Sequence, residues 1–129
     1  MMTIKVKEYT KVDFRRCSQE ALDSFGSLEA LKVDGGLYLV GCTGLMRLPD
    51  GLKVNRGLYL VGCTGLTKLP DGLNVRHRLE VTWCSGITKL PYDLHVGGYI
   101  YYNSKTGFYG HEDEPGVIPE RLKHKLYKF

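Results

Sequence analysis

The chain has 129 residues, of which 43% are hydrophobic and 25% are charged, and its formal net charge is +4. This length fits one domain, and this composition excludes a disordered, collagen-like or membrane-spanning chain. The mild positive charge permits contact with nucleic acid or with an acidic protein surface but predicts neither. Residues 1–7 lack the apolar stretch of a secretory signal, which favours a cytoplasmic location and no membrane partner.

Residues 1–28 are predicted to form an N-terminal cap. Residues 3–9 favour a strand, and residues 12–25 favour a helix with Asp13 as its N-cap and Gly26 as its stop. The apolar residues of this helix recur at helical spacing: Phe14, Cys17, Ala21, Leu22 and Phe25. A cap is expected because an open repeat end exposes apolar side chains and unpaired strand edges.

Residues 29–112 contain a repeat of 21 residues. Units that begin at Leu31 and Leu52 are nearly identical, and a third at Leu73 keeps the apolar positions while its polar positions diverge. A fourth unit, at Leu94, is eroded. Constant apolar positions between variable polar ones predict stacked coils that bury the first set and expose the second. We therefore expect a solenoid of about four coils.

Each unit contains two short strand signals and leaves no room for a helix. In the first unit these are residues 31–33 and the alternating residues 37–40, and the Pro-Asp-Gly sequence at 49–51 signals a tight turn. In the fourth unit the equivalent positions are filled by Ile100 and Tyr102 in the strand, Lys105 in place of the cysteine, and Phe108 at the next apolar site.

Residues 37–45 and 58–66 both read Leu-Tyr-Leu-Val-Gly-Cys-Thr-Gly-Leu. They resemble the LxLxx(N/C)xxL core of leucine-rich repeats, and the resemblance covers residues 29–96. The short unit with its Leu-Pro pair is similar to the bacterial and bacteriophage members of this family, in which the convex side is extended chain and not helix. With the caps, the resemblance implies a mainly β fold with terminal helices, a leucine-rich-repeat solenoid.

Residues 113–129 are predicted to form a C-terminal cap with a basic tail. Pro119 stands where a first helical residue would, and Leu122, Leu126 and Phe129 form one apolar stripe of a short helix. The residues before this predicted helix, 106–118, have the composition of a loop and carry an acidic run.

Three cysteines recur at the repeat period, at Cys42, Cys63 and Cys84. Three equivalent positions cannot all pair, so we expect an inward ladder of reduced thiols and not a disulfide. No two cysteines are closer than 21 residues, which disfavours a zinc site because such sites need short local spacings. We expect no metal and no other cofactor.

The sequence also predicts a protein without catalytic residues. None of the four histidines lies in the spacing of a metal site or a catalytic triad, and the glycines fall at repeat turns and not in a phosphate-binding loop. We therefore expect neither an enzyme nor a small-molecule substrate. The histidines are His77, His95, His111 and His124.

Exposed positions of stacked coils align in columns. The residue between the strand leucines is Tyr38, Tyr59, Glu80 and Tyr101 in the four units, which predicts an exposed aromatic ladder of the kind found at binding hot spots. A purely protective role for these rings over the sheet is the alternative. The third unit also replaces glycine with basic residues. The predicted partner-binding residues are Tyr38, Tyr59, Arg76, Arg78, Glu80, Trp83 and Tyr101, centred on Arg78, Glu80 and Trp83.

These features favour a non-catalytic protein–protein interaction module that binds through its strand face. The resemblance adds a more specific hypothesis, a phage or bacterial inhibitor of a defence or host protein. The alternative is nucleic-acid binding, in which basic residues contact phosphates and tyrosines stack on bases. Its basic residues would be Arg56, Arg76, Arg78, Lys89 and the tail. A second basic column is formed by Arg47, Lys68 and Lys89. Self-association of the chain through an exposed sheet edge is a third hypothesis.

Overall fold

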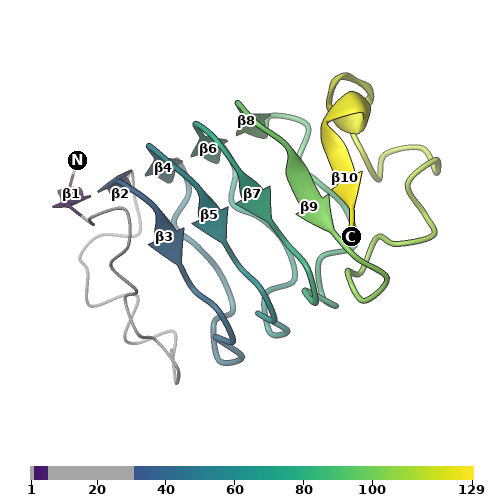
Figure 1. Ribbon diagram of the computed structural model, residues 1–129, viewed down its shortest axis with the longest axis horizontal. Helices are drawn as coiled ribbons and strands as arrows, with labels where there is room; N and C mark the ends of the chain where they lie inside the picture. Colours follow the sequence, from purple (N-terminus) through teal and green to yellow (C-terminus); the bar gives the residue numbers. More distant parts are fainter. Residues whose placement is uncertain (1, 6–30) are drawn as a thin grey trace.

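The computed structural model describes residues 2–5 and 31–129. It is a mainly β, parallel solenoid of about three regular turns with a repeat of 21 residues (Figure 1). The strands form two five-stranded sheets, and every strand pairs with its neighbours in parallel. The predicted helix at 12–25 lies outside the described residues, whereas part of the predicted N-terminal strand is present as β1.

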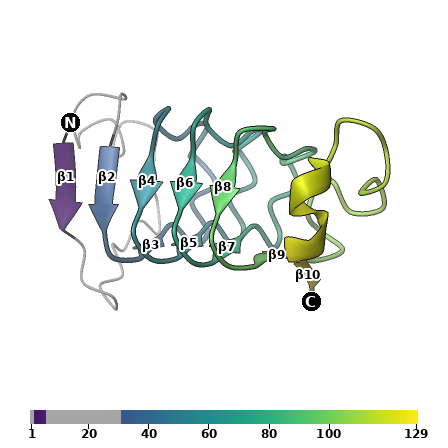
Figure 2. The ribbon, with the colours of Figure 1, turned by 90° about the horizontal axis from the view of Figure 1, so that it is seen from above.

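The first sheet has the strand order β1-β2-β4-β6-β8. Its strands are β1 (Met2–Lys5), β2 (Leu31–Asp34), β4 (Lys53–Val54), β6 (Asn74–Val75) and β8 (His95–Val96). The second sheet has the order β10-β9-β7-β5-β3. Its strands are β3 (Leu37–Tyr38), β5 (Leu58–Tyr59), β7 (Leu79–Glu80), β9 (Ile100–Tyr102) and β10 (Leu126–Lys128). Figure 2 shows the strands of the first sheet side by side along the solenoid axis.

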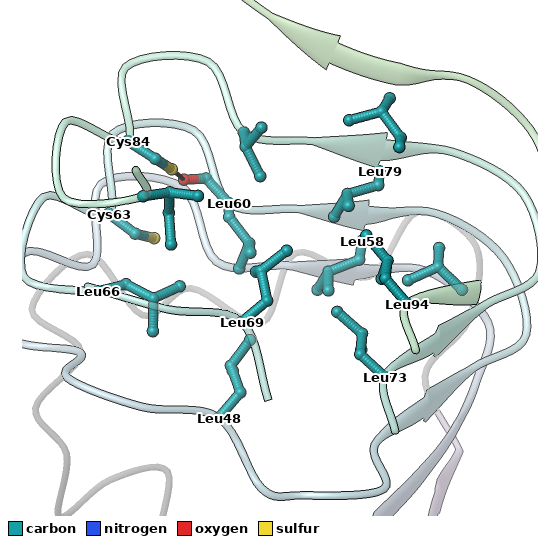
Figure 3. Close-up of a cluster of buried hydrophobic side chains, with 14 of the residues drawn as sticks. Leu48, Leu58, Leu60, Cys63, Leu66, Leu69, Leu73, Leu79, Cys84 and Leu94 are labelled. Atoms are coloured by element: carbon teal, nitrogen blue, oxygen red, sulfur yellow. Dashed lines mark hydrogen bonds between the residues drawn. The ribbon is translucent and has the colours of Figure 1, made fainter. Parts of the chain in front are cut away.

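The repeat leucines and valines form one continuous core, as the spacing predicted. In the second turn, Leu58, Leu60 and Leu66 are completely buried. Backbone pairing places Leu58 between Leu37 and Leu79, and Figure 3 shows Leu58 and Leu79 next to each other in the core. A single turn cannot cover its own apolar residues, so the neighbouring turns supply the burial that stabilises each unit.

The cysteine ladder faces inward, which confirms the prediction. Cys63 and Cys84 are fully buried, and no disulfide joins the cysteines of the repeats. The Cys63 thiol donates a hydrogen bond to the carbonyl oxygen of Leu39 at 2.7 Å. The Cys84 thiol donates to the carbonyl oxygen of Leu60 at 2.7 Å, and Figure 3 shows this second contact. Burial raises the pKa of Cys84 to about 12, so this thiol stays protonated and remains a donor.

The fourth unit has a different register from the predicted one. Lys105 is exposed and does not replace the cysteine. Thr106 takes that place: it is buried, and its hydroxyl donates to the carbonyl oxygen of Val81 at 2.9 Å. One extra residue between Cys84 and Thr106 shifts the pattern, and Phe108 then returns to the core as predicted. The regular solenoid is therefore shorter than the four coils expected.

Beyond Phe108 the chain leaves the coil and then rejoins it. The backbone N–H of Leu90 donates to the carbonyl oxygen of Val117 at 2.8 Å, so the chain has returned to the stack at this point. The N–H of Leu122 then donates to the carbonyl oxygen of Pro119, as the N–H of Leu94 does to that of Pro91. The turn that closes each repeat therefore recurs once more after an inserted loop.

The prediction of a terminal helix with an apolar stripe through Phe129 is wrong. Of residues 113–129, only Glu120–Lys125 is helical, as the 3-10 helix η1, and the next residues form strand β10, which pairs with β9. Leu122 is buried, but Phe129 is 61% exposed. Pairing with β9 satisfies backbone groups at an edge that further helix would leave unpaired, which explains the change of conformation.

Candidate functional site

The outer face of the second sheet carries the predicted column of side chains. Backbone pairing places Tyr38 beside Tyr59, Tyr59 beside Glu80, and Glu80 beside Tyr101. Strand β10 extends the column by one residue that the sequence analysis missed, because Tyr127 pairs with Tyr101. The column therefore runs from the first described turn to the C-terminal strand.

The tyrosines of the first two turns lie flat on the sheet. The rings of Tyr38 and Tyr59 are parallel within 1°, with centroids 4.4 Å apart. A Cβ atom at Gly57 would lie 2.6 Å from the Tyr59 ring, so the missing side chain creates the space that the ring occupies. Both tyrosines are consequently half-buried and less exposed than predicted.

The third turn replaces this glycine–tyrosine pair with Arg78 and Glu80. The Arg78 guanidinium lies 3.7 Å from the centroid of the Tyr101 ring and 5.7 Å from that of Tyr59. Its Nη2 atom donates to Oε1 of Glu80 at 2.5 Å. Since a planar guanidinium stacks well on aromatic rings, Arg78 bridges the interruption that Glu80 makes in the tyrosine column.

Aromatic residues in the last two strands and directly next to them continue the stack. The Tyr101 ring centroid is 5.2 Å from that of Tyr127 and 5.3 Å from that of Phe129. Tyr99 contacts Tyr101 edge-on, at 6.3 Å. The signal for this extension was present in the sequence, since the pair Leu126-Tyr127 repeats the Leu-Tyr pair of the first two units. We name this surface the aromatic–arginine stack: Tyr38, Tyr59, Arg78, Glu80, Tyr101, Tyr127 and Phe129.

Trp83 lies beyond the end of β7 and has an unusual backbone. Its φ is 63°, and it is the one residue other than glycine with a positive φ among those the structure describes. The equivalent residues of the two preceding turns are Gly41, with φ of 73°, and Gly62, with φ of 75°. A side chain in this region costs roughly 1–2 kcal/mol. The indole is nevertheless 53% exposed, so burial does little to offset that strain.

The predicted hot spot is therefore only partly assembled. Arg78 and Glu80 are paired within the stack, but Trp83 makes no ring contact with any residue that the structure describes. Arg76 is exposed at the end of β6, outside the stack. These two residues do not belong to the stack.

A cleft of about 730 Å³ is lined by residues outside the stack. Lys68 and Lys89, from the predicted second basic column, form part of its wall together with Asp71, Asp113 and Glu114. Because both signs of charge line this cleft, its electrostatics select no class of ligand. Within residues 2–5 and 31–129, no group of three or more His, Cys, Asp and Glu side chains is placed to hold a metal ion.

Comparisons with family models, with curated proteins and with solved structures give no match to this chain. In the described part of the chain, no helix has the length and apolar character needed to cross a membrane.

Proposed function

We propose that the protein is a non-catalytic interaction module that binds a protein partner through the aromatic–arginine stack. The observation that carries this proposal is the unbroken row of contacting rings and one guanidinium along a sheet face. Tyrosine, tryptophan and arginine are the residues most enriched in binding hot spots. Rings that are already packed lose little conformational freedom when a partner covers them, so binding to such a surface costs little entropy.

Trp83 supports the same proposal independently. A tryptophan with positive φ, at a position that glycine occupies in two other turns, lowers the stability of the solenoid without being buried. Such a residue is readily explained if its exposed ring inserts into a partner. Trp83 and Arg76 then form the edges of a binding surface whose centre is the Arg78–Glu80 pair.

The stack favours a protein partner over a nucleic acid. Tyr38 and Tyr59 cover each other's ring faces, and Arg78 lies over the ring of Tyr101. Bases therefore cannot insert between these groups as they do on open aromatic platforms. Glu80 also neutralises the arginine at the centre of the stack, which weakens the attraction for phosphates.

We also propose that the solenoid is a short leucine-rich repeat. The 21-residue period, the inward cysteine of each of the first three units and the Leu-Pro turn support this assignment. The resemblance to bacterial and bacteriophage repeats leads to the narrower hypothesis of an inhibitor. Its test is to assay an identified partner with and without the purified chain, and unchanged activity under saturating binding would exclude inhibition.

The experiment compares two sets of alanine variants. Tyr59→Ala, Glu80→Ala and Trp83→Ala alter the proposed surface, whereas Lys53→Ala and His95→Ala alter exposed residues of the opposite sheet. Proteins captured from a bacterial lysate are identified by mass spectrometry, and their affinities are then measured with purified components by calorimetry.

We expect the first set to weaken binding at least about tenfold at unchanged secondary structure, and the second set to leave it unchanged. Loss of binding only in the opposite-sheet variants would contradict the proposal. Tight binding of single-stranded oligonucleotides with a steep salt dependence would establish the nucleic-acid alternative instead.

A further inference from the structure

A small cleft lies beside the aromatic–arginine stack, over the first three turns. Its volume is about 180 Å³, and it is lined by Gly36, Tyr38, Arg56, Gly57, Tyr59, His77 and Arg78. Pockets for drug-sized ligands are about 300–1,000 Å³, so this cleft suits a single functional group and not a whole small molecule.

Every polar side chain that lines this cleft can donate a hydrogen bond. Arg56 and Arg78 are donors only, His77 donates from at least one ring nitrogen, and both tyrosines have hydroxyl groups. No carboxylate is among the lining residues. Glu80 is not part of the wall, but its pairing with Arg78 offsets the charge of that arginine, so Arg56 and His77 carry most of the attraction for an anion. This donor set is complementary to an anionic group.

The second and third turns create this chemistry by replacing glycines of the first turn with basic residues. In backbone register, Gly35, Arg56, His77 and Gly98 follow one another, because the N–H of each later residue donates to the carbonyl oxygen of the earlier one. The groups that can be positively charged are thus confined to the two middle turns. A nucleic-acid strand needs positive charge along its whole path. A single acidic side chain needs only one such position.

We propose that this cleft binds the carboxylate of an aspartate or glutamate side chain on the protein partner. The inference rests on the proposed function, because it assigns the chemistry of the group that the partner places next to the stack. Bidentate recognition of a carboxylate by an arginine also fixes orientation, so the cleft would set the direction in which the partner lies across the strands.

The cleft can be tested without the partner. The full chain, labelled with ¹⁵N and ¹³C, is titrated with N-acetylglutamate amide and, in parallel, with its neutral isostere N-acetylglutamine amide. We expect saturable NMR shifts at Gly57 and His77 with the glutamate compound, at a Kd of about 10 mM for charge-assisted hydrogen bonds to one carboxylate. The glutamine compound should give no saturable shift there, and His95 serves as an internal reference.

Matched variants identify the residues responsible. Replacement of His77 by Gln and of Arg56 by Gln should each weaken glutamate binding by about threefold or more, and His95→Gln should leave it unchanged. Equal shifts with both compounds, or no saturable shift at Gly57 and His77, would overturn the proposal. An oligothymidylate that saturates the cleft at far lower concentration than glutamate would also overturn it, because the cleft would then prefer a nucleic-acid phosphate.

The two proposals fail in different ways. If Trp83→Ala abolishes binding of the partner but the Arg56 and His77 variants bind it with wild-type affinity, the binding surface stands and the carboxylate cleft is overturned. If glutamate binds in the cleft but captured partners are insensitive to Tyr59→Ala and Trp83→Ala, the cleft binds an anion and the proposed function fails.

Discussion

The second turn, residues 52–72, and the third, residues 73–93, bury equivalent side chains at equivalent positions but present different surfaces. The buried sets are Leu58, Leu60, Cys63, Leu66 and Leu69 against Leu79, Val81, Cys84, Ile87 and Leu90. Along strands β5 and β7 and the turns that follow them, the residues differ: Gly57, Tyr59, Val61 and Gly62 of the second turn correspond to Arg78, Glu80, Thr82 and Trp83 of the third. Of these four differences, the one at Thr82 is buried. The core of a solenoid is therefore maintained while its surface changes one turn at a time.

The surface changes of the third turn are coupled. The Tyr59 ring needs the space that Gly57 leaves. When arginine takes the position of Gly57, as Arg78 does in the third turn, a tyrosine cannot lie flat there in the same way. Arg78 and Glu80 satisfy this requirement together, since the ion pair replaces the packed ring. Two turns with equivalent buried residues can thus carry two different pairs of residues on the sheet face, glycine with a packed tyrosine or arginine with glutamate.

The largest expected effect tests whether the two cores are equivalent. Leu58→Ala and Leu79→Ala each remove a completely buried side chain with neighbours in the turns above and below. Each should lower the free energy of unfolding by about 3 kcal/mol, and the two values should agree within about 1 kcal/mol. Urea denaturation followed by circular dichroism measures both. A much smaller cost at Leu79 would show that the third turn is loosely packed.

Alkaline pH tests the inward ladder. The pKa of Cys84 rises from its ordinary 9.0 to about 12 on burial. The folded state therefore holds this proton more tightly than the unfolded state does. Its contribution is complete below pH 9 and is lost as the pH rises towards 12, by roughly 1 kcal/mol per pH unit. Burial and the hydrogen bond to Glu112 raise the pKa of Tyr102 to about 12. This residue therefore adds to the loss of stability above pH 10.

Thr106 supplies the matched control for this effect. Its hydroxyl makes the same type of hydrogen bond as the Cys84 thiol but does not titrate. Cys84→Thr should therefore flatten the decline in melting temperature between pH 9 and pH 11. An unchanged decline in this variant would show that the Cys84 thiol does not cause it.

The smallest expected change in stability concerns the strained residue. Trp83→Gly restores the residue that the two preceding turns have at this position and should raise the free energy of unfolding by about 1 kcal/mol. For a chain of this size the melting temperature would rise by about 4 °C. Gly62→Trp is the reciprocal variant and should lower it. A destabilised Trp83→Gly protein would mean that the indole contributes packing that outweighs its strain.

The sequence was sufficient to predict the repeat, the buried leucines and the inward cysteines, because these features depend on spacing alone. It misplaced the fourth unit because one inserted residue moves Thr106, and not Lys105, into the cysteine position. It also assigned helix to the last residues, since Leu122 and Leu126 lie four apart. Strand β10 forms through long-range pairing with β9, which a local pattern does not reveal.

The candidate site was predicted in part. The tyrosine column follows directly from the period. That Tyr59 lies flat on Gly57, and that Arg78 reaches the Tyr101 ring, depends on side-chain conformations that the sequence does not specify. The positive φ of Trp83 was detectable in principle, because the aligned residues Gly41 and Gly62 are both glycine.

The most direct test of the binding surface rewrites the third turn with the surface of the second. The variant Arg78→Gly/Glu80→Tyr/Thr82→Val/Trp83→Gly keeps every buried apolar residue, replaces the buried Thr82 with the valine of the second turn, and completes the tyrosine column. Calorimetric titration of an identified partner should show at least about a hundredfold loss of affinity in a protein as stable as the wild type or more so. Wild-type affinity in this variant would contradict the account, because the residues that distinguish the third turn would then play no part in binding.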